Sequence, residues 1–438
     1  MTPVPRRTPG QQLHAGFCSA VVAALACAVG AQASDRVAEV SVLLDPALDV
    51  GRNRPLVDVT VCNATGDECQ IVQRVLLDTG ATGLMLKPAV WSNWRTPLHR
   101  LHSPGGPWGF CARFEQIVVW SWLAWAHVGI AGLRTLEPIP IGLIVNAGVA
   151  PPDCDPTDVD AALPGDINGI LGVAAPRSYC AGFPGGRCPI GWSQSAYYTL
   201  HSSSGYWQAA QPPPSVDLAN PIAHFAYGYN DGIVLRMPAL RRIAPGARAL
   251  RGELHLGVAA SLAALFPAAP LPEYPTLFDS HIAGTIRVGA RSCEGYLGVD
   301  SGAAFNQLPH ALTCAGRDCV TQPCRGFECG AATLTLGEIG SWQQLGGVLV
   351  PSVIARSLPL KLKIADADEL GVDWGAHDGA THFVDGLVPT LGMPFLYGRT
   401  LAVGISGSAA PSGRMYPFGY LLIADNPLPP ASGAGRDD

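Results

Sequence analysis

Two short segments of the sequence share an order of residue types that suits proton transfer. Each holds apolar residues, an aspartate, a hydroxyl residue, a glycine and an alanine: Val75 to Ala81 contains Asp78, and Tyr296 to Ala303 contains Asp300. Two carboxyl groups held close together cannot easily both ionise, so they share one proton and titrate as a pair. The ionised partner can take a proton from water while the protonated partner donates one to a carbonyl oxygen. The residues therefore predict acid–base chemistry on water, with no metal and no cofactor.

The residues beside each aspartate suit a rigid pair of loops. Gly80 and Gly302 allow a tight turn and a close approach by the opposite loop. Thr79 and Ser301 can donate hydrogen bonds that cross-link the two loops. One such tripeptide alone is more often an ordinary turn at the end of a strand. Two copies with matching flanks indicate an internal duplication and a pseudo-twofold axis.

Each aspartate segment is followed later by a short segment that ends in an apolar residue and a glycine, at Ile170 to Gly172 and at Thr390 to Gly392. The four segments together resemble the pepsin-like and retropepsin-like aspartic peptidases. That resemblance implies a mainly β, bilobal pepsin-like aspartic protease fold with pseudo-twofold related lobes. It also implies catalytic roles for Asp78 and Asp300, and supporting active-site loops that contain Thr79, Gly80, Ser301 and Gly302.

A second resemblance covers roughly residues 37 to 425. The motifs at residues 76–84, 168–173, 295–302 and 393–400 are similar to those of an uncharacterised family of bacterial exported proteins in the aspartic-peptidase clan. Such a similarity implies the fold more strongly than the activity, because one fold can carry many functions.

The sequence departs from the pepsin-like pattern at the flap, a hairpin that carries a tyrosine near its tip in those enzymes. The equivalent position falls near Phe114, and no Tyr-Gly-Thr-Gly motif stands there. Phe114, Trp120 and Trp122 are the candidates for a flap or an apolar wall for substrate. Ordinary packing within a strand is the alternative interpretation of the tryptophans.

Alternating apolar segments predict the strands that must position these residues. We expect a hairpin from residues 56 to 77, an apolar hairpin-like region at 117–130, and a surface loop at 182–214. The expected divisions are a signal peptide (1–33), an N-terminal lobe carrying Asp78 (34–226), a C-terminal lobe carrying Asp300 (227–426) and a disordered tail (427–438).

Composition restricts the class of protein and its location. Of the 438 residues, 48% are hydrophobic and 14% charged, and the formal net charge is -6. No basic stripe is present, so nucleic acid is not an expected partner. Arg6 and Arg7, the apolar run 20–29 and Ala31 to Ala33 predict a cleaved signal peptide, with a retained anchor helix or a lipoprotein through Cys27 as alternatives. We expect an exported monomer, periplasmic or secreted, with no membrane span after cleavage.

Cysteines support an oxidising compartment. The chain has 13, and the predicted signal peptide removes Cys18 and Cys27, which leaves an odd number. Close spacing predicts disulfides between Cys62 and Cys69 and between Cys180 and Cys188. Four more at 314, 319, 324 and 329 leave zinc or disulfides open, and disulfides are favoured because C-x2-C pairs are absent.

The sequence therefore predicts an aspartic endopeptidase that takes a peptide or protein substrate into a cleft between the lobes. The alternative is a non-catalytic protein that binds peptide, glycan or a protein partner in the same cleft. A structural component of the cell envelope is a third interpretation.

Overall fold

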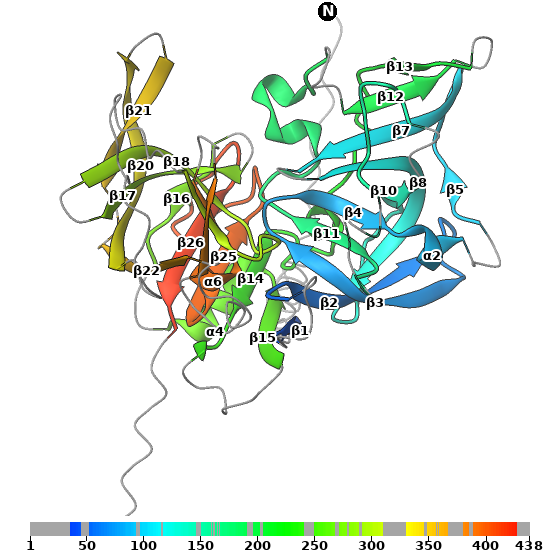
Figure 1. Ribbon diagram of the computed structural model, residues 1–438. Coiled ribbons are helices and arrows are strands. Elements are labelled where there is room, and N and C mark those ends of the chain that lie inside the picture. The colour runs from blue at the N-terminus through cyan, green and yellow to red at the C-terminus, as the bar shows by residue number, and fades with distance from the viewer. Residues whose placement is uncertain are drawn as a thin grey trace, which may run out of the picture. The chain divides into compact units, whose positions relative to one another are not determined.

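The protein is described here from a computed structural model (Figure 1). The described residues belong to one compact unit. They are 36–44, 52–92, 97–114, 117–145, 150–158, 160, 163, 165, 167–190, 196–201, 205–240, 249–267, 271–277, 280–288, 291–309, 330–345, 348–355, 357, 359–366, 380–384 and 389–426. The predicted signal peptide, the predicted tail and the four cysteines from Cys314 to Cys329 lie outside these residues.

The fold is mainly β, as the sequence predicts, and its strands form two hydrogen-bonded sheets. The larger sheet contains 18 of the described strands. They are β1 (Arg36–Leu43), β2 (Pro55–Cys62), β3 (Cys69–Asp78), β4 (Thr82–Leu86), β5 (His99–Arg100), β6 (His102–Ser103), β7 (Gly106–Arg113), β8 (Val118–Ile130), β9 (Leu133–Arg134), β10 (Ile139–Ile144), β11 (Gly169–Val173), β12 (Tyr197–Leu200), β13 (Trp207–Ala209), β14 (Gly232–Arg236), β15 (Ala249–Leu256), β16 (Tyr274–Pro275), β25 (Arg399–Gly404) and β26 (Tyr420–Asp425).

The smaller sheet contains eight of the described strands, all from the second half of the chain. They are β17 (Ile282–Val288), β18 (Arg291–Val299), β19 (Asn306–Pro309), β20 (Gly330–Leu345), β21 (Val348–Ala355), β22 (Leu360–Asp366), β23 (Ala380–Val384) and β24 (Thr390–Leu391). Helices are short: α2 (Pro88–Trp91), α4 (Val258–Leu265), α6 (Met393–Leu396), and the 3-10 turns η2 (Cys180–Gly182), η3 (Pro184–Gly186) and η5 (Pro221–His224).

The hairpin of β2 and β3 shows why these residues form strands. Along β2, Val57, Val59 and Val61 are buried while Asp58 is exposed, which is the alternation of a strand with one face in the core. The turn is closed by the Asn63 side chain, whose Oδ1 accepts a hydrogen bond from the Gly66 N–H at 2.9 Å.

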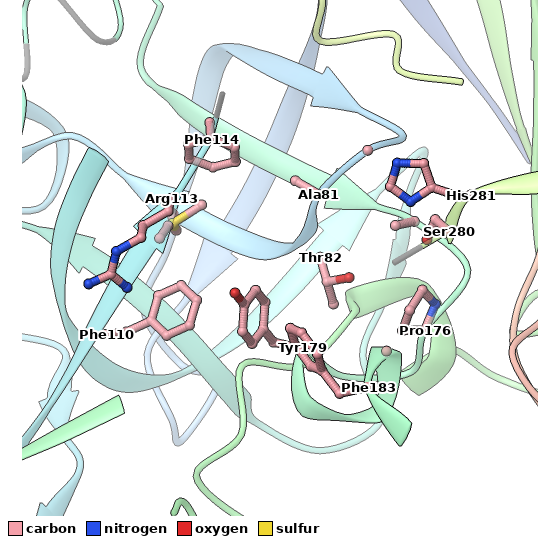
Figure 2. Close-up of a pocket in the computed structure, with 15 residues that line it drawn as sticks. Ala81, Thr82, Phe110, Arg113, Phe114, Pro176, Tyr179, Phe183, Ser280 and His281 are labelled. Carbon is pink, nitrogen blue, oxygen red and sulfur yellow. The ribbon is translucent and has the colours of Figure 1, made fainter. Parts of the chain in front are cut away.

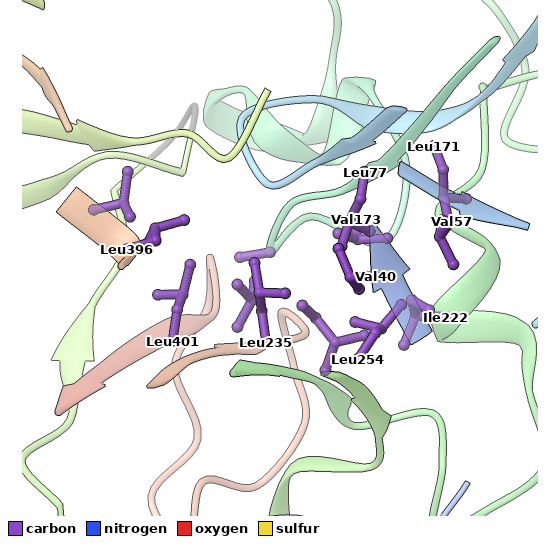
Figure 3. Packing of buried hydrophobic residues seen from close by; sticks show 14 of the residues in the cluster. Val40, Val57, Leu77, Leu171, Val173, Ile222, Leu235, Leu254, Leu396 and Leu401 are labelled. Carbon is purple, nitrogen blue, oxygen red and sulfur yellow. The ribbon is translucent and has the colours of Figure 1, made fainter. Parts of the chain in front are cut away.

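The core crosses the predicted boundary at residue 226. Figure 3 shows Leu77 and Leu171 in one apolar cluster with Leu235, Leu254 and Leu401. Strand pairing is also continuous, because β1 pairs with β15 along its whole length. The two sequence halves therefore share one sheet and one core, and the division into two lobes stays a prediction.

Two predictions about segments were wrong. Residues 118–130 form the single long strand β8, which pairs with β7, β10 and β2 and is not itself a hairpin. The segment 182–214 is not all surface loop, because it contains β12, where Tyr197 and Tyr198 are buried. Both hydroxyls donate to aspartates, to Asp217 at 2.6 Å and to Asp153 at 2.7 Å, and this satisfies their polar ends inside the protein.

Three disulfides join described residues. The Cys62–Cys69 and Cys180–Cys188 bonds were predicted from spacing and are confirmed. The third, Cys111–Cys154, links residues 43 positions apart and was not predicted. These bonds are consistent with an exported protein. Among the described residues, no helix has the length and apolar character needed to cross a membrane.

Candidate functional site

Strand packing brings the first aspartate loop to the end of β3. Asp78 is the last residue of β3, after three buried apolar residues. Beneath it, β11 pairs in parallel with β3, so that Gly172 lies opposite Asp78, and β11 also pairs with β4 on the other side of the loop. A side-chain carbon on Gly172 would lie 2.5 Å from the Ala81 carbonyl carbon, so only glycine fits there.

The second aspartate loop is built in the same way. Asp300 follows the last residue of β18, and β24 pairs in parallel with that strand. The Asp300 N–H donates to the Leu391 carbonyl oxygen at 3.0 Å. A side-chain carbon on Gly392 would overlap the Phe305 carbonyl group, and the Gly392 N–H donates to Asn306 Oδ1 at 3.0 Å. The two apolar-glycine segments of the sequence thus lie under the two aspartate loops.

Reciprocal hydrogen bonds cross-link the loops through their hydroxyl residues. Thr79 Oγ1 donates to the Val299 carbonyl oxygen at 3.0 Å and accepts from the Ser301 N–H at 2.9 Å. Ser301 Oγ donates to the Leu77 carbonyl oxygen at 2.6 Å and accepts from the Thr79 N–H at 3.1 Å. All four hydrogen bonds are buried, so water does not reach these hydroxyl, N–H and carbonyl groups. Each loop therefore supplies the hydrogen-bond partners that the other loop needs.

The two carboxyl groups lie together between these loops. Asp78 Oδ1 accepts from the Gly80 N–H at 2.8 Å, and Asp300 Oδ1 accepts from the Gly302 N–H at 2.7 Å. A side-chain carbon on Gly80 would lie 2.7 Å from Asp300 Cγ, and one on Gly302 would lie 2.8 Å from Asp78 Cγ. Each carboxyl group therefore packs on the glycine of the opposite loop.

Burial makes the ionised form of Asp78 unfavourable. Its side chain is only 5% exposed. Burial, followed by the negative charge of Asp300 and a hydrogen bond with that carboxyl group, raises the pKa of Asp78 well above its usual range. The N–H groups of Gly80 and Ala81 oppose the rise because they donate to the carboxylate. The arrangement can hold one proton in the pair at a pH where an exposed aspartate has lost its proton.

A pocket of about 340 Å³ opens beside the first aspartate loop (Figure 2). Gly80, Ala81 and Thr82 form the side next to the carboxyl pair. The remaining lining residues are Met85, Phe110, Ala112, Arg113, Phe114, Ala174, Pro176, Tyr179, Gly182, Phe183, Ser280 and His281. The pocket has the mixture of aromatic walls and a few polar groups that is typical of ligand sites.

The candidate wall residues have different positions. Phe114 follows β7 at the tip of the β7–β8 hairpin and lines the pocket. Trp120 is fully buried and packs against Tyr198 and Trp207, with ring centroids 5.7 and 4.9 Å away. The guanidinium carbon of Arg100 lies over Trp122, 3.5 Å from the centroid of the Trp122 ring. Neither tryptophan is among the residues that line the pocket.

Two aromatic residues that line the pocket, Tyr179 and Phe183, were not predicted from the sequence. Tyr179 and Phe183 lie on or next to the segment closed by the Cys180–Cys188 disulfide, and their rings pack against each other at 5.5 Å between centroids. Two aromatic residues beside a short cysteine-bounded segment were a usable signal. The abundance of glycine, serine and proline across residues 182–214 instead indicated a surface loop.

The search for metal ligands among the described residues yields one group, Cys180, Cys188 and Asp217. Both cysteines are joined in a disulfide, so their sulfurs are not thiolate ligands. Asp217 is already occupied, because it accepts hydrogen bonds from the Tyr197 hydroxyl and the Cys180 N–H.

Comparisons with known proteins give a family and a distant structural likeness. The crystal structure of an aspartic proteinase from Irpex lacteus aligns over 90% of this chain and 98% of that chain, with 13% sequence identity and a TM-score of 0.46. No curated protein matches the sequence. A family model described as "Protein of unknown function (DUF3443)" matches residues 33–420, and the chain therefore belongs to the DUF3443 family.

Proposed function

We propose that the protein is an aspartic-type endopeptidase that hydrolyses peptide bonds with the Asp78–Asp300 pair. The observation that carries the proposal is the mutual packing of the carboxyl groups, each on the glycine of the opposite loop. The loops are joined by reciprocal hydrogen bonds from Thr79 and Ser301. Such a pair is pre-organised, which is what acid–base catalysis requires.

The chemistry depends on one shared proton. Burial favours the protonated form of Asp78, and the ionised partner takes a proton from water as the water oxygen attacks the peptide carbonyl carbon. The protonated carboxyl group donates to the carbonyl oxygen, which forms a neutral tetrahedral diol. The pair then gives its proton to the amide nitrogen, the carbon–nitrogen bond breaks, and a hydroxyl group of the diol returns one proton to the pair as the carboxylic acid product forms.

The pocket supports an extended peptide or protein as the substrate. Because Gly80 to Thr82 lie between the carboxyl pair and the pocket, a side chain near the cleaved bond can enter the pocket while the bond lies at the pair. Phe114 follows β7, near the position expected for the tyrosine of a pepsin-like flap, and it offers no hydroxyl group. We place the reaction in an exported protein, periplasmic or secreted, consistent with the disulfides.

The test is cleavage of unfolded casein and mixed peptides between about pH 3 and about pH 7, the range over which a carboxyl pair can hold one proton. Asp78→Asn and Asp300→Asn should each lower the rate by about a hundredfold to ten-thousandfold. Pepstatin, which imitates the tetrahedral diol, should inhibit the wild-type protein.

The matched control is Asp231→Asn, a change at a partly buried carboxyl group outside both loops, which accepts from the Val258 N–H at 2.9 Å and from the Ala259 N–H at 3.2 Å. It should retain activity because it leaves both aspartate loops and their hydrogen bonds unchanged. Cleavage that survives both loop substitutions would refute the mechanism. Peptide binding by the wild-type protein without cleavage at any pH would instead favour a non-catalytic binding protein.

A further inference from the structure

The strand register places a cation opposite the first aspartate. In the antiparallel pair of β2 and β3, Leu56 is opposite Leu76 and Val57 is opposite Val75. Continuing this register by two residues toward the loop sets Arg54 opposite Asp78. Opposite residues of an antiparallel pair project to the same face of the sheet. The arginine immediately before β2 therefore belongs to the surroundings of the carboxyl pair.

The same segment also reaches the second aspartate loop. Asn53 Nδ2 donates to the Ala304 carbonyl oxygen at 2.6 Å, four residues beyond Asp300. Asn53 is fully buried, and its Oδ1 accepts a hydrogen bond from the Tyr397 hydroxyl. These bonds hold the backbone beside Arg54 against the second half of the site.

Arg54 is a half-buried cation. Its Nε is buried and has no hydrogen-bond partner among the residues that the structure describes. Burial lowers the pKa of Arg54, and the negative charges of Asp78 and Asp300 oppose that change. A guanidinium stays protonated in proteins even so. The two carboxyl groups are thus the counter-charges that the cation has within the described structure.

We propose that Arg54 is a positioning residue for the carboxyl pair, whose fixed positive charge keeps the pair singly ionised at acid pH. The effect of Arg54 on catalysis rests on the proposed peptidase function. The titration of the carboxyl pair can be measured whether or not the protein is a peptidase. A nearby cation favours the ionised form of a carboxyl group. It therefore offsets part of the burial that raises the pKa of Asp78, and allows one of the two protons to leave at lower pH.

The experiment measures the titration of the pair directly in the full protein. Carboxyl carbons are labelled with ¹³C in aspartate, and the signals of Asp78 and Asp300 are identified by their loss in the two asparagine variants. In Arg54→Gln, both steps of the pair should move to higher pH, by about one pH unit for removal of a neighbouring positive charge. Arg54→Lys should keep both steps close to their wild-type pH values, because it keeps the positive charge. Arg54→Met gives the same comparison as Arg54→Gln should the amide variant not fold.

The control is Arg100→Gln, which removes an arginine stacked on Trp122 and should leave the titration of the pair unchanged. Other ionisable groups near the site are the neighbouring Arg52 and the imidazole of His281 in the pocket. A step that belongs to His281 should persist in all Arg54 variants and disappear in His281→Gln. Titration curves that coincide in the wild-type protein and both neutral Arg54 variants would overturn the proposal.

The pH profile of cleavage separates this proposal from the proposed function. If the protein is a peptidase, both limbs of its bell-shaped profile should move to higher pH in Arg54→Gln by the amount seen in the titration. A shifted titration in a protein that cleaves nothing would support the role of Arg54 and refute the peptidase. An active protein in which Arg54→Gln changes neither the pH profile nor the titration would support the peptidase and refute the role of Arg54.

Discussion

The two aspartate loops have the same hydrogen bonds but different surroundings. In both, a hydroxyl residue donates to the carbonyl oxygen that precedes the other aspartate, and a glycine N–H donates to the loop's own carboxyl group. Asp78 is nearly inaccessible, whereas Asp300 is partly exposed. The pocket lies against Gly80 to Thr82, and no residue from Asp300 to Ala303 lines it.

This difference shows that the same order of aspartate, hydroxyl residue and glycine can place two carboxyl groups in different environments. The backbone of each loop is set by its own strand, turn and glycine. The ionisation of each carboxyl group depends instead on burial, on the opposite charge and on the neighbouring cation, none of which is local in sequence. Three experiments test how far the likeness and the difference extend.

The glycines under the loops should show the largest effect. Gly172→Ala and Gly392→Ala each place a carbon against backbone of the loop above, which cannot move aside without distorting the aspartate. Chemical denaturation should show a loss of at least about 3 kcal/mol in the free energy of unfolding for either variant. Gly295→Ala in β18 is the matched control, because its added carbon meets nothing within 4 Å, and it should stay within about 0.5 kcal/mol. A neutral result at either buried glycine would mean that its loop is not packed as described.

The hydroxyl residues should show an intermediate and nearly equal effect. Thr79→Val and Ser301→Ala each leave a buried carbonyl oxygen and a buried N–H without a partner. Each should lower the free energy of unfolding by about 1 to 3 kcal/mol. The double variant should lose less than the sum, because the two hydroxyls join the same loops. If the two losses in the free energy of unfolding add strictly, or if only one of the two variants is destabilised, the hydrogen bonds of the two loops are not equivalent.

The pH dependence of stability should show the smallest effect, and it should reveal the effect of the deeper burial of Asp78. Because the pKa of Asp78 is raised in the folded protein, the folded state keeps a proton that the unfolded chain has released. Stability is therefore fully present below about pH 4 and falls as the pH rises through the folded pKa, by about 1.4 kcal/mol for each unit of difference.

Thermal unfolding across this pH range should show that decline in the wild-type protein and a smaller one in Asp78→Asn. Asp67→Asn is the control, because hydrogen bonds from Thr65 and Asn63 lower the pKa of Asp67, so its effect lies at lower pH. A wild-type and an Asp78→Asn curve that run parallel above about pH 4 would show that burial does not hold the proton on Asp78.

Much of the fold and part of the site could be predicted because their signals are local. Alternation along β2, the turn beginning at Asn63 and the short spacing of Cys62 and Cys69 predict one hairpin within a single stretch of chain. The repeated aspartate segments and the apolar-glycine segments predict the residues that pack together. The failures concern partners distant in sequence: Cys111 and Cys154, and β12, whose buried tyrosines depend on β7 for their environment.

The sequence by itself determined the two aspartate loops, because the residues that shape each turn lie within it or pair with its own strand. Only the tertiary structure decided what surrounds them. Phe114 and Trp120 are both aromatic and close in sequence, yet one lines the pocket and the other is buried among Tyr198 and Trp207. Arg54 acquires its place from strand register and from a hydrogen bond made by its neighbour. Charge and burial act through space, and only the folded chain defines those distances.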